Sequence, residues 1–164
     1  MVSCVSLLAY IQKLQYIHRQ AFLTKIKGRG AVPRQISSMA KKLIIIMVNT
    51  DPRNGEELGA PFFQATVAAA LDYEVEVVCT ATAGQLMKKG VADKLVVKQG
   101  SPKTVYDFIK DAHEAGVKFY CCSPNLDLFD MTEKDLIPEC EGIVGGAKVI
   151  EEVMEDDNAR VLTY

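Results

Sequence analysis

An uninterrupted run of apolar residues, 43–48, is the first segment of the chain that can enter a hydrophobic core. Strands that helices cover on both faces have this composition, so we interpret the run as the central strand of a sheet. Residues 75–79 and 117–121 are also mainly apolar, each with one charged residue, and predict a second and a third strand. Shorter apolar segments at 143–144 and 161–162 predict a fourth strand and a terminal edge strand.

Helical patterns separate the first three strands. An Ala-rich stretch at 60–71 predicts a buried helix, and a short helix is expected at 83–89, before a brief strand or extended turn at 95–97. Ser101 as N-cap and Pro102 as the first helical residue predict a further helix, which Gly116 ends. The positions of this helix that should face inward are Val105, Phe108, Ile109 and Ala112.

Further helix starts follow the third predicted strand. Ser123 and Pro124 begin a helical turn, residues 132–135 resemble a capping box, and a glycine pair leads into a helix at 147–156. Strands and helices that alternate in this order predict an α/β domain with a mainly parallel, doubly wound sheet and helices on both faces. A chain of 164 residues has room for one such domain.

The first 38 residues have a different character. Apolar positions at helical spacing, surrounded by Lys, Arg and Gln, make a basic amphipathic segment, which is typical of a membrane-surface helix or a transit peptide. We favour a third interpretation, in which residues 1–38 are an extension or linker outside the fold, because Met39 leads directly into the first strand. The domain is therefore expected at 39–164, and membrane contact only if residues 1–38 are native.

Charge and cysteine content narrow the functional classes. The formal net charge is −2, but residues 1–50 contain no Asp or Glu, and residues 43–164 hold eleven basic against twenty-one acidic side chains. An acidic body repels a phosphate backbone, so we do not expect nucleic acid as a partner. The five cysteines lack the spacing of a disulfide framework. We expect a soluble domain in a reducing compartment, the cytoplasm.

Sites of open parallel sheets lie beyond the carboxyl ends of the strands. Three places qualify: the loop with Thr50 and Asp51, the turn at Thr80, and the segment from Cys121 to Pro124. Cys122 directly precedes Ser123, the predicted N-cap of a helix whose unpaired N–H groups and dipole favour a thiolate. We therefore select Cys122 as the candidate nucleophile.

The other cysteines have weaker claims. Alternation along a strand points Cys121 and Cys122 to opposite faces, and a free cysteine is more often a small buried hydrophobe, which we expect of Cys121 and Cys79. Cys140 lies between two glutamates, whose charges should raise its pKa. Cys140 and Cys121 nevertheless remain candidate second thiols, because either could resolve an oxidised Cys122.

Metal and nucleotide sites are not indicated. The sequence has no C-x-x-C or H-x-x-x-H pattern, and residues 142–146 match neither the dinucleotide nor the phosphate-loop fingerprint. The turn at Gly145 and Gly146 could still cradle an anion at a helix start, although we favour tight packing as its explanation. We expect neither a metal nor a cofactor.

The order of these motifs resembles the DsrE/DsrF-like family of small sulfur-relay proteins. The shared features are an opening strand, a helix, a strand that ends in cysteine, a short helix, an Asp-Leu-Ile segment and a glycine-rich turn. They lie at residues 42–47, 66–71, 117–123, 126–131, 135–137 and 141–147. The resemblance therefore spans essentially all of residues 41–164.

The resemblance implies a five-stranded, flavodoxin-like three-layer domain that assembles as trimers or hexamers. In members that relay sulfur, a cysteine after the third main strand carries it as a persulfide. Cys122, the residue before Ser123, matches that position, while Cys121 beside it leaves the register open by one residue. The implied partners are sulfur donor and acceptor proteins.

Two other functions remain open at this point. One is a thiol-disulfide or peroxide-reducing protein that uses Cys122 with Cys140 or Cys121 as the resolving thiol. The other is an oligomeric module that binds small molecules near Thr50, Asp51 and the glycine turn.

Overall fold

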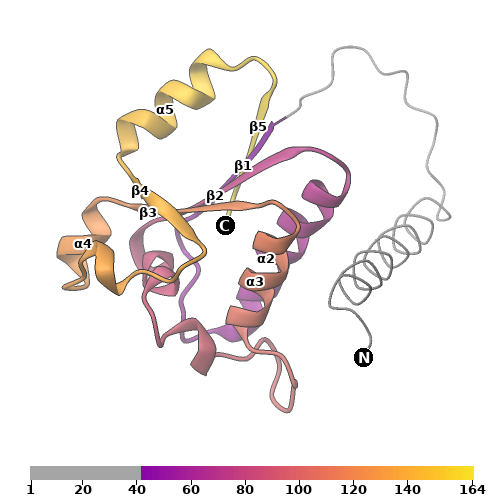
Figure 1. Cartoon of the computed structure of the whole chain (residues 1–164), viewed down its shortest axis with the longest axis vertical. Helices are drawn as coiled ribbons and strands as arrows, with labels where there is room; N and C mark the ends of the chain where they lie inside the picture. The colour runs from indigo at the N-terminus through magenta and orange to yellow at the C-terminus, as the bar shows by residue number, and fades with distance from the viewer. Residues whose placement is uncertain (1–41) are drawn as a thin grey trace, which may run out of the picture. The chain divides into compact units, whose positions relative to one another are not determined.

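The computed structural model describes residues 42–164. Our interpretation of residues 1–38 and the predicted start of the domain at residue 39 lie outside these described residues. All five predicted strands are present and form one sheet, shown in Figure 1. Their bounds are β1 Lys42–Met47, β2 Glu74–Cys79, β3 Lys118–Cys122, β4 Cys140–Val144 and β5 Ala159–Thr163.

Every pair of neighbouring strands is parallel, and the order across the sheet is β4-β3-β2-β1-β5. The α/β class and the edge position of the last strand are thus confirmed. The prediction that 43–48 is the central strand is wrong, because β2 holds that place and β1 lies between β2 and β5. An uninterrupted apolar run indicates that both faces of a strand are covered. All interior strands of the sheet are covered on both faces, so the run does not identify the central one.

The helices are α2 Gly55–Ala70, α3 Val105–Glu114, α4 Pro124–Leu128 and α5 Gly146–Glu155. Three short 3₁₀ helices accompany them: η1 Ala81–Met87, η2 Ala92–Lys94 and η3 Glu133–Asp135. The helix predicted at 83–89 is therefore η1, and residues 95–97 contribute only an isolated bridge, from Val96 to Thr104. Helix α2 begins earlier than predicted, where Gly55 allows the backbone of Val96 to approach closely: a Cβ on Gly55 would lie 2.0 Å from the Val96 carbonyl oxygen.

The N-cap of α3 is Thr104 and not Ser101. The Thr104 hydroxyl accepts from the backbone N–H of Asp107 at 3.2 Å, and the Asp107 carboxylate accepts from the backbone N–H of Thr104 at 2.9 Å. This reciprocal capping box satisfies two helix-end donors that Ser101 would leave open. Gly116 follows the end of α3 with a φ of 102°, as its predicted role at the helix end requires.

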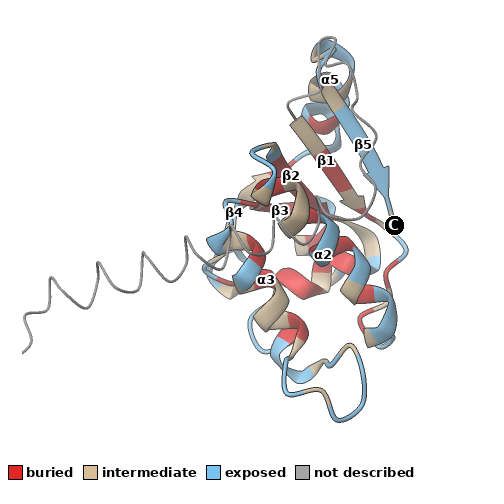
Figure 2. Ribbon diagram, turned by 90° about the vertical axis from the view of Figure 1, so that its right-hand side faces the viewer, coloured by how far each residue is buried: buried red, intermediate tan, exposed pale blue. Residues whose placement is uncertain are grey.

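The two faces of the sheet are covered unequally. Helices α2 and α3 pack on one face, where Phe62 and Phe119 place their ring centroids 6.0 Å apart within the main core. Helix α5 covers the other face, and its Val149 packs with Val78 and Val144. Figure 2 shows the buried residues concentrated between the strands and the α2–α3 layer. The predicted arrangement, with helices on both faces, is confirmed.

Candidate functional site

Cys122 is the last residue of β3, and the register pairs it with Val144, the last residue of β4. Its side chain is on the face of the sheet that α5 covers, because Tyr120 two residues earlier packs against the cluster of Val78, Val144 and Val149. The residue is 8% exposed. Cys122 therefore lies at the end of β3, beside the residue at which β4 ends.

Cys121 points to the opposite face, as alternation predicts. It is fully buried in the core that α2 and α3 form, and it pairs in register with Cys79 of β2. Burial is the largest of the effects that raise the pKa of Cys121, to about 11. The expectation that Cys121 and Cys79 are core residues is consistent with this burial.

The chain leaves β3 and β4 in opposite directions, as Figure 1 shows. The connection after β3 enters α4, whose Leu126 packs on the core that contains Cys121. The connection after β4 enters α5 on the face of Cys122. Neighbouring parallel strands with diverging connections define a topological switch point, where open α/β sheets form their ligand crevice. Cys122 lies at this point.

Cys122 and α4, the helix predicted to favour its thiolate, lie on different faces of the sheet. Helix α4 has five residues and lies on the side of Cys121. Three of its first four residues offer no free donor: the N–H of Ser123 donates to the Val144 carbonyl at 2.9 Å, that of Leu126 donates to the Ser123 carbonyl at 3.2 Å, and Pro124 has no N–H. The helix start on the side of Cys122 is that of α5.

The first turn of α5 is open and free of negative charge. Gly145 is its N-cap, and the first turn holds no acidic side chain. A Cβ on Gly145 or Gly146 would meet no atom within 4 Å, and neither residue has a positive φ. Tight packing within residues 42–164 therefore does not explain this glycine pair, contrary to our expectation. The N–H groups of an N-terminal turn attract negative charge.

Cys140 lies on the face of Cys121 and not on that of Cys122. It packs on the main core, pairs in register with Phe119, and its thiol donates to the Gly142 carbonyl at 3.4 Å. Burial raises the pKa of Cys140, and the charge of Glu141 contributes only a minor part. The direction of this shift matches the sequence argument, but its main cause is different. The sheet separates Cys140 from Cys122, whereas Cys140 and Cys121 share one side.

Thr50 and Asp51 follow β1, two strands away from β3, so the structure does not join them to the site at Cys122. The Thr50 hydroxyl is buried and has no hydrogen-bond partner among residues 42–164. Asp51 accepts hydrogen bonds from the Arg53 side chain and backbone, which lower its pKa to about 2. The predicted site residues thus form two groups: Thr50 with Asp51, and Cys122 with Ser123, Gly145 and Gly146.

Asn125 is a residue that the sequence analysis missed. It is fully buried, its Nδ2 donates to the Cys79 carbonyl at 3.2 Å, and its Oδ1 has no partner among the described residues. Gly84 makes room for it, since a Cβ there would lie 1.3 Å from Asn125 Nδ2. Asn125 also lowers the pKa of Cys121 by a hydrogen bond, against the larger effect of burial. No sequence signal links Gly84 to Asn125, because forty residues separate them.

Comparisons with known proteins agree with this fold. The model of the DsrE/DsrF/DrsH-like family matches residues 81–159. The crystal structure of the YchN protein from E. coli has a TM-score of 0.59 at 17% identity, and covers 75% of this chain and 99% of its own. A protein of unknown function from Methanobacterium thermoautotrophicum, MTH1491, has a TM-score of 0.52 at 16% identity, and covers 75% and 98%. At these identities the structural likeness shows the fold alone.

Curated protein sequences give no match to this chain. Within residues 42–164, no helix is long and apolar enough to cross a membrane, and no group of three or more His, Cys, Asp or Glu side chains could hold a metal ion. The family match covers the segment from η1 to the start of β5, including Cys122 and the glycine turn. The resemblance to the DsrE/DsrF-like family that the motifs predict is thus confirmed over residues 81–159.

Proposed function

We propose that this protein relays sulfur as a persulfide on Cys122. The observation that carries the proposal is the position of Cys122 at the switch point between β3 and β4, on the side of the open first turn of α5. The match of residues 81–159 to the DsrE/DsrF/DrsH-like family supports a role in sulfur relay. The partners would be a sulfur donor and a sulfur acceptor, either proteins or small thiols.

The proposed transfer has two balanced steps. In the first, the Cys122 thiolate attacks the terminal sulfur of a donor persulfide, so that a Cys122 S–S bond forms while the donor S–S bond breaks and the donor leaves as a thiolate. In the second, an acceptor thiolate attacks the outer sulfur of Cys122 persulfide, and Cys122 leaves as a thiolate. No external oxidant or reductant is needed. The N–H groups at the start of α5 and the Lys148 ammonium, which lies 5.0 Å from the Tyr120 ring centroid, offer positive charge on the same face.

The proposal is tested by intact mass after treatment with polysulfide. We expect the native chain to gain sulfur and the Cys122→Ser variant to gain none, while Cys140→Ser, the matched control, loads like the native chain. The control is informative because Cys140 is half-buried and lies on the other face. Loading that persists in Cys122→Ser and disappears in Cys140→Ser would refute the proposal.

A steric prediction follows from the space above the glycine turn. Gly146→Ala should leave stability unchanged or raise it by up to about 1 kcal/mol, because Ala favours the helix and meets no atom within 4 Å. If the donor reaches Cys122 over this turn, the same variant should load sulfur more slowly. Equal loading rates in Gly146→Ala and the native chain would show that the donor approaches from elsewhere.

A thiol-disulfide role is the second candidate, and one observation changes its form. The structure places Cys140 with Cys121 on one face, so the disulfide it favours is Cys121–Cys140 and not one with Cys122. Peptide mapping after treatment with hydrogen peroxide would distinguish these pairs.

We also propose, from the family alone, that the protein assembles as a trimer or hexamer in the cytoplasm, and sedimentation would test the assembly.

A further inference from the structure

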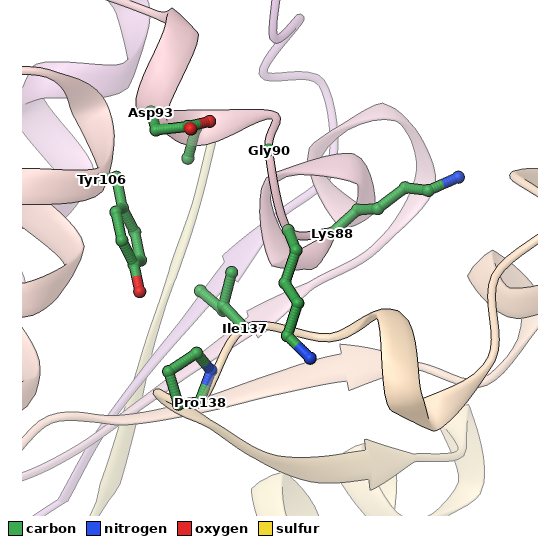
Figure 3. A pocket seen from close by; sticks show the side chains of 8 residues that line it. Lys88, Gly90, Asp93, Tyr106, Ile137 and Pro138 are labelled. Carbon is green, nitrogen blue, oxygen red and sulfur yellow. The ribbon is translucent and has the colours of Figure 1, made fainter.

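A pocket of about 310 Å³ lies between η1, η2, α3 and the segment before β4. Figure 3 shows Tyr106 and Asp93 on one side of the pocket and Lys88 on the other, with Ile137 and Pro138 between them. Lys89 also lines the pocket, whereas Cys122, Ser123, Gly145 and Gly146 do not. It is therefore a different place from the thiol site.

The backbone fixes the walls of this pocket. Lys88 and Leu136 form an antiparallel bridge, flanked by hydrogen bonds of 2.8 Å from the Lys89 N–H to the Asp135 carbonyl and from the Ile137 N–H to the Met87 carbonyl. The side chains of the floor are anchored in the core, since Ile137 is 4% exposed. A ligand would thus meet a largely preformed cavity, which limits the entropy lost on binding.

Tyr106 provides a fixed aromatic wall. Its hydroxyl donates to the Glu139 carboxylate, at 2.9 and 3.1 Å from the two oxygens. The Lys110 ammonium, which does not line the pocket, lies 5.0 Å from the ring centroid. These contacts hold the ring plane, and a held ring favours the stacking of a flat aromatic group.

The two pocket lysines carry positive charge and interact electrostatically with the Asp135 carboxylate, without forming a close ion pair. Lys88 Nζ donates to the Phe129 carbonyl at 3.2 Å, and Lys89 Nζ donates to the Lys134 carbonyl at 2.6 Å. Among the described residues, no salt bridge joins either lysine to a carboxylate. Both ammonium groups keep further donors for an anion. Asp93, the carboxylate that lines the pocket, repels an anion and directs it toward the lysines.

We propose that this pocket binds a small aromatic carboxylate. The carboxylate contacts Lys89, and the ring stacks on Tyr106 above the apolar surface of Ile137 and Pro138. The volume is at the lower end of the range for small-molecule sites, about 300 to 1,000 Å³, so the ligand has one or two rings. Binding here does not depend on Cys122 or on sulfur transfer.

The test uses the full chain and 2-naphthoate as the probe, followed by its own fluorescence anisotropy. The chain has no Trp, so tryptophan emission does not interfere. We expect saturable binding at one site per chain, and binding of the uncharged 2-naphthamide that is about tenfold weaker, as the loss of one charge-assisted contact predicts. Equal binding of the amide and the acid, or no saturable binding, would overturn the proposal.

Three variants localise the probe. Lys89→Gln should weaken binding of 2-naphthoate by about tenfold, whereas Lys98→Gln, an exposed lysine away from the pocket, should not change it. Tyr106→Leu should weaken both naphthalene probes, and Tyr106→Phe, which keeps the ring, should retain most of the binding. Circular dichroism confirms that each variant is folded. Binding that survives both Lys89→Gln and Tyr106→Leu in folded protein would place the probe elsewhere and refute the site.

Discussion

Lys42 joins the sheet to α5 through two carboxylates, and its removal should be costly. The Lys42 Nζ lies 3.0 Å from Glu76 Oε1 and also binds Glu152. The side chains of Lys42 and Glu76 are 10% and 6% exposed. Lys42→Met keeps most of the aliphatic chain but leaves the Glu76 charge buried without its cation. Breaking a buried pair in this way costs about 3–5 kcal/mol.

The pair of Lys118 and Glu74 is a matched control on the neighbouring strands. Its atoms are also 3.0 Å apart, but its side chains are 43% and 50% exposed. Water screens such a pair, so Lys118→Met should cost about 0–1 kcal/mol. The double variant Lys42→Met/Glu76→Gln should recover part of the stability lost in Lys42→Met, since it removes the stranded charge.

Urea denaturation at neutral pH measures all of these variants. Burial tends to lower the pKa of Lys42, but its hydrogen bonds with Glu152 and Glu76 outweigh burial and raise the pKa above the ordinary 10.5. A group whose pKa is higher in the folded than in the unfolded state stabilises the fold fully at any pH below its unfolded-state pKa. That stabilisation is lost only as the pH rises through the folded-state pKa. The stabilisation by Lys42 should therefore be constant around neutrality and decline in strong alkali. Equal losses of unfolding free energy in Lys42→Met and Lys118→Met would refute the argument.

Two further substitutions test local packing and capping by the same denaturation assay. Gly84→Ala should cost at least about 2 kcal/mol, because the new Cβ would lie 1.3 Å from Asn125 Nδ2 and the buried amide cannot move away freely; a neutral result would show that Asn125 is less fixed than its contacts indicate. Thr104→Ala should cost about 1 kcal/mol by removing the capping box of α3, while Ser101→Ala should cost less than half of that; equal costs would restore Ser101 as the cap.

The elements of the fold were predictable because their signals are local. Apolar runs identified the strands, and glycine and capping patterns located most helices. The order of the strands was harder to predict from the sequence. Both β1 and β2 are covered on two faces, and only long-range pairing places β2 at the centre. The cap of α3 was misassigned because Ser-Pro and the Thr104 box are competing local signals three residues apart, and reciprocal hydrogen bonds favour the second.

The site was less predictable than the fold. The position of Cys122 at a strand end follows from sequence, but the helix that covers its face of the sheet does not. That helix is set by the side on which the chain leaves the sheet, and the return of the chain from β4 at one edge to β5 at the other places α5 on the face opposite α2 and α3. The role of Asn125 likewise depends on Gly84, a neighbour only in space.

The adjacent cysteines have different surroundings, because a shift of one residue along a strand moves a side chain to the other face of the sheet. Cys121 pairs with Cys79 inside the core, beside a buried amide and without exposure to solvent. Cys122 belongs to the other face, where the turn at Gly145 and Gly146 leaves open space. A shift of β3 by one residue would exchange the surroundings of the two thiols, because side chains alternate strictly along a strand. The pairing of Cys122 with Val144 at the ends of β3 and β4 therefore determines which thiol lies on the face of the open glycine turn.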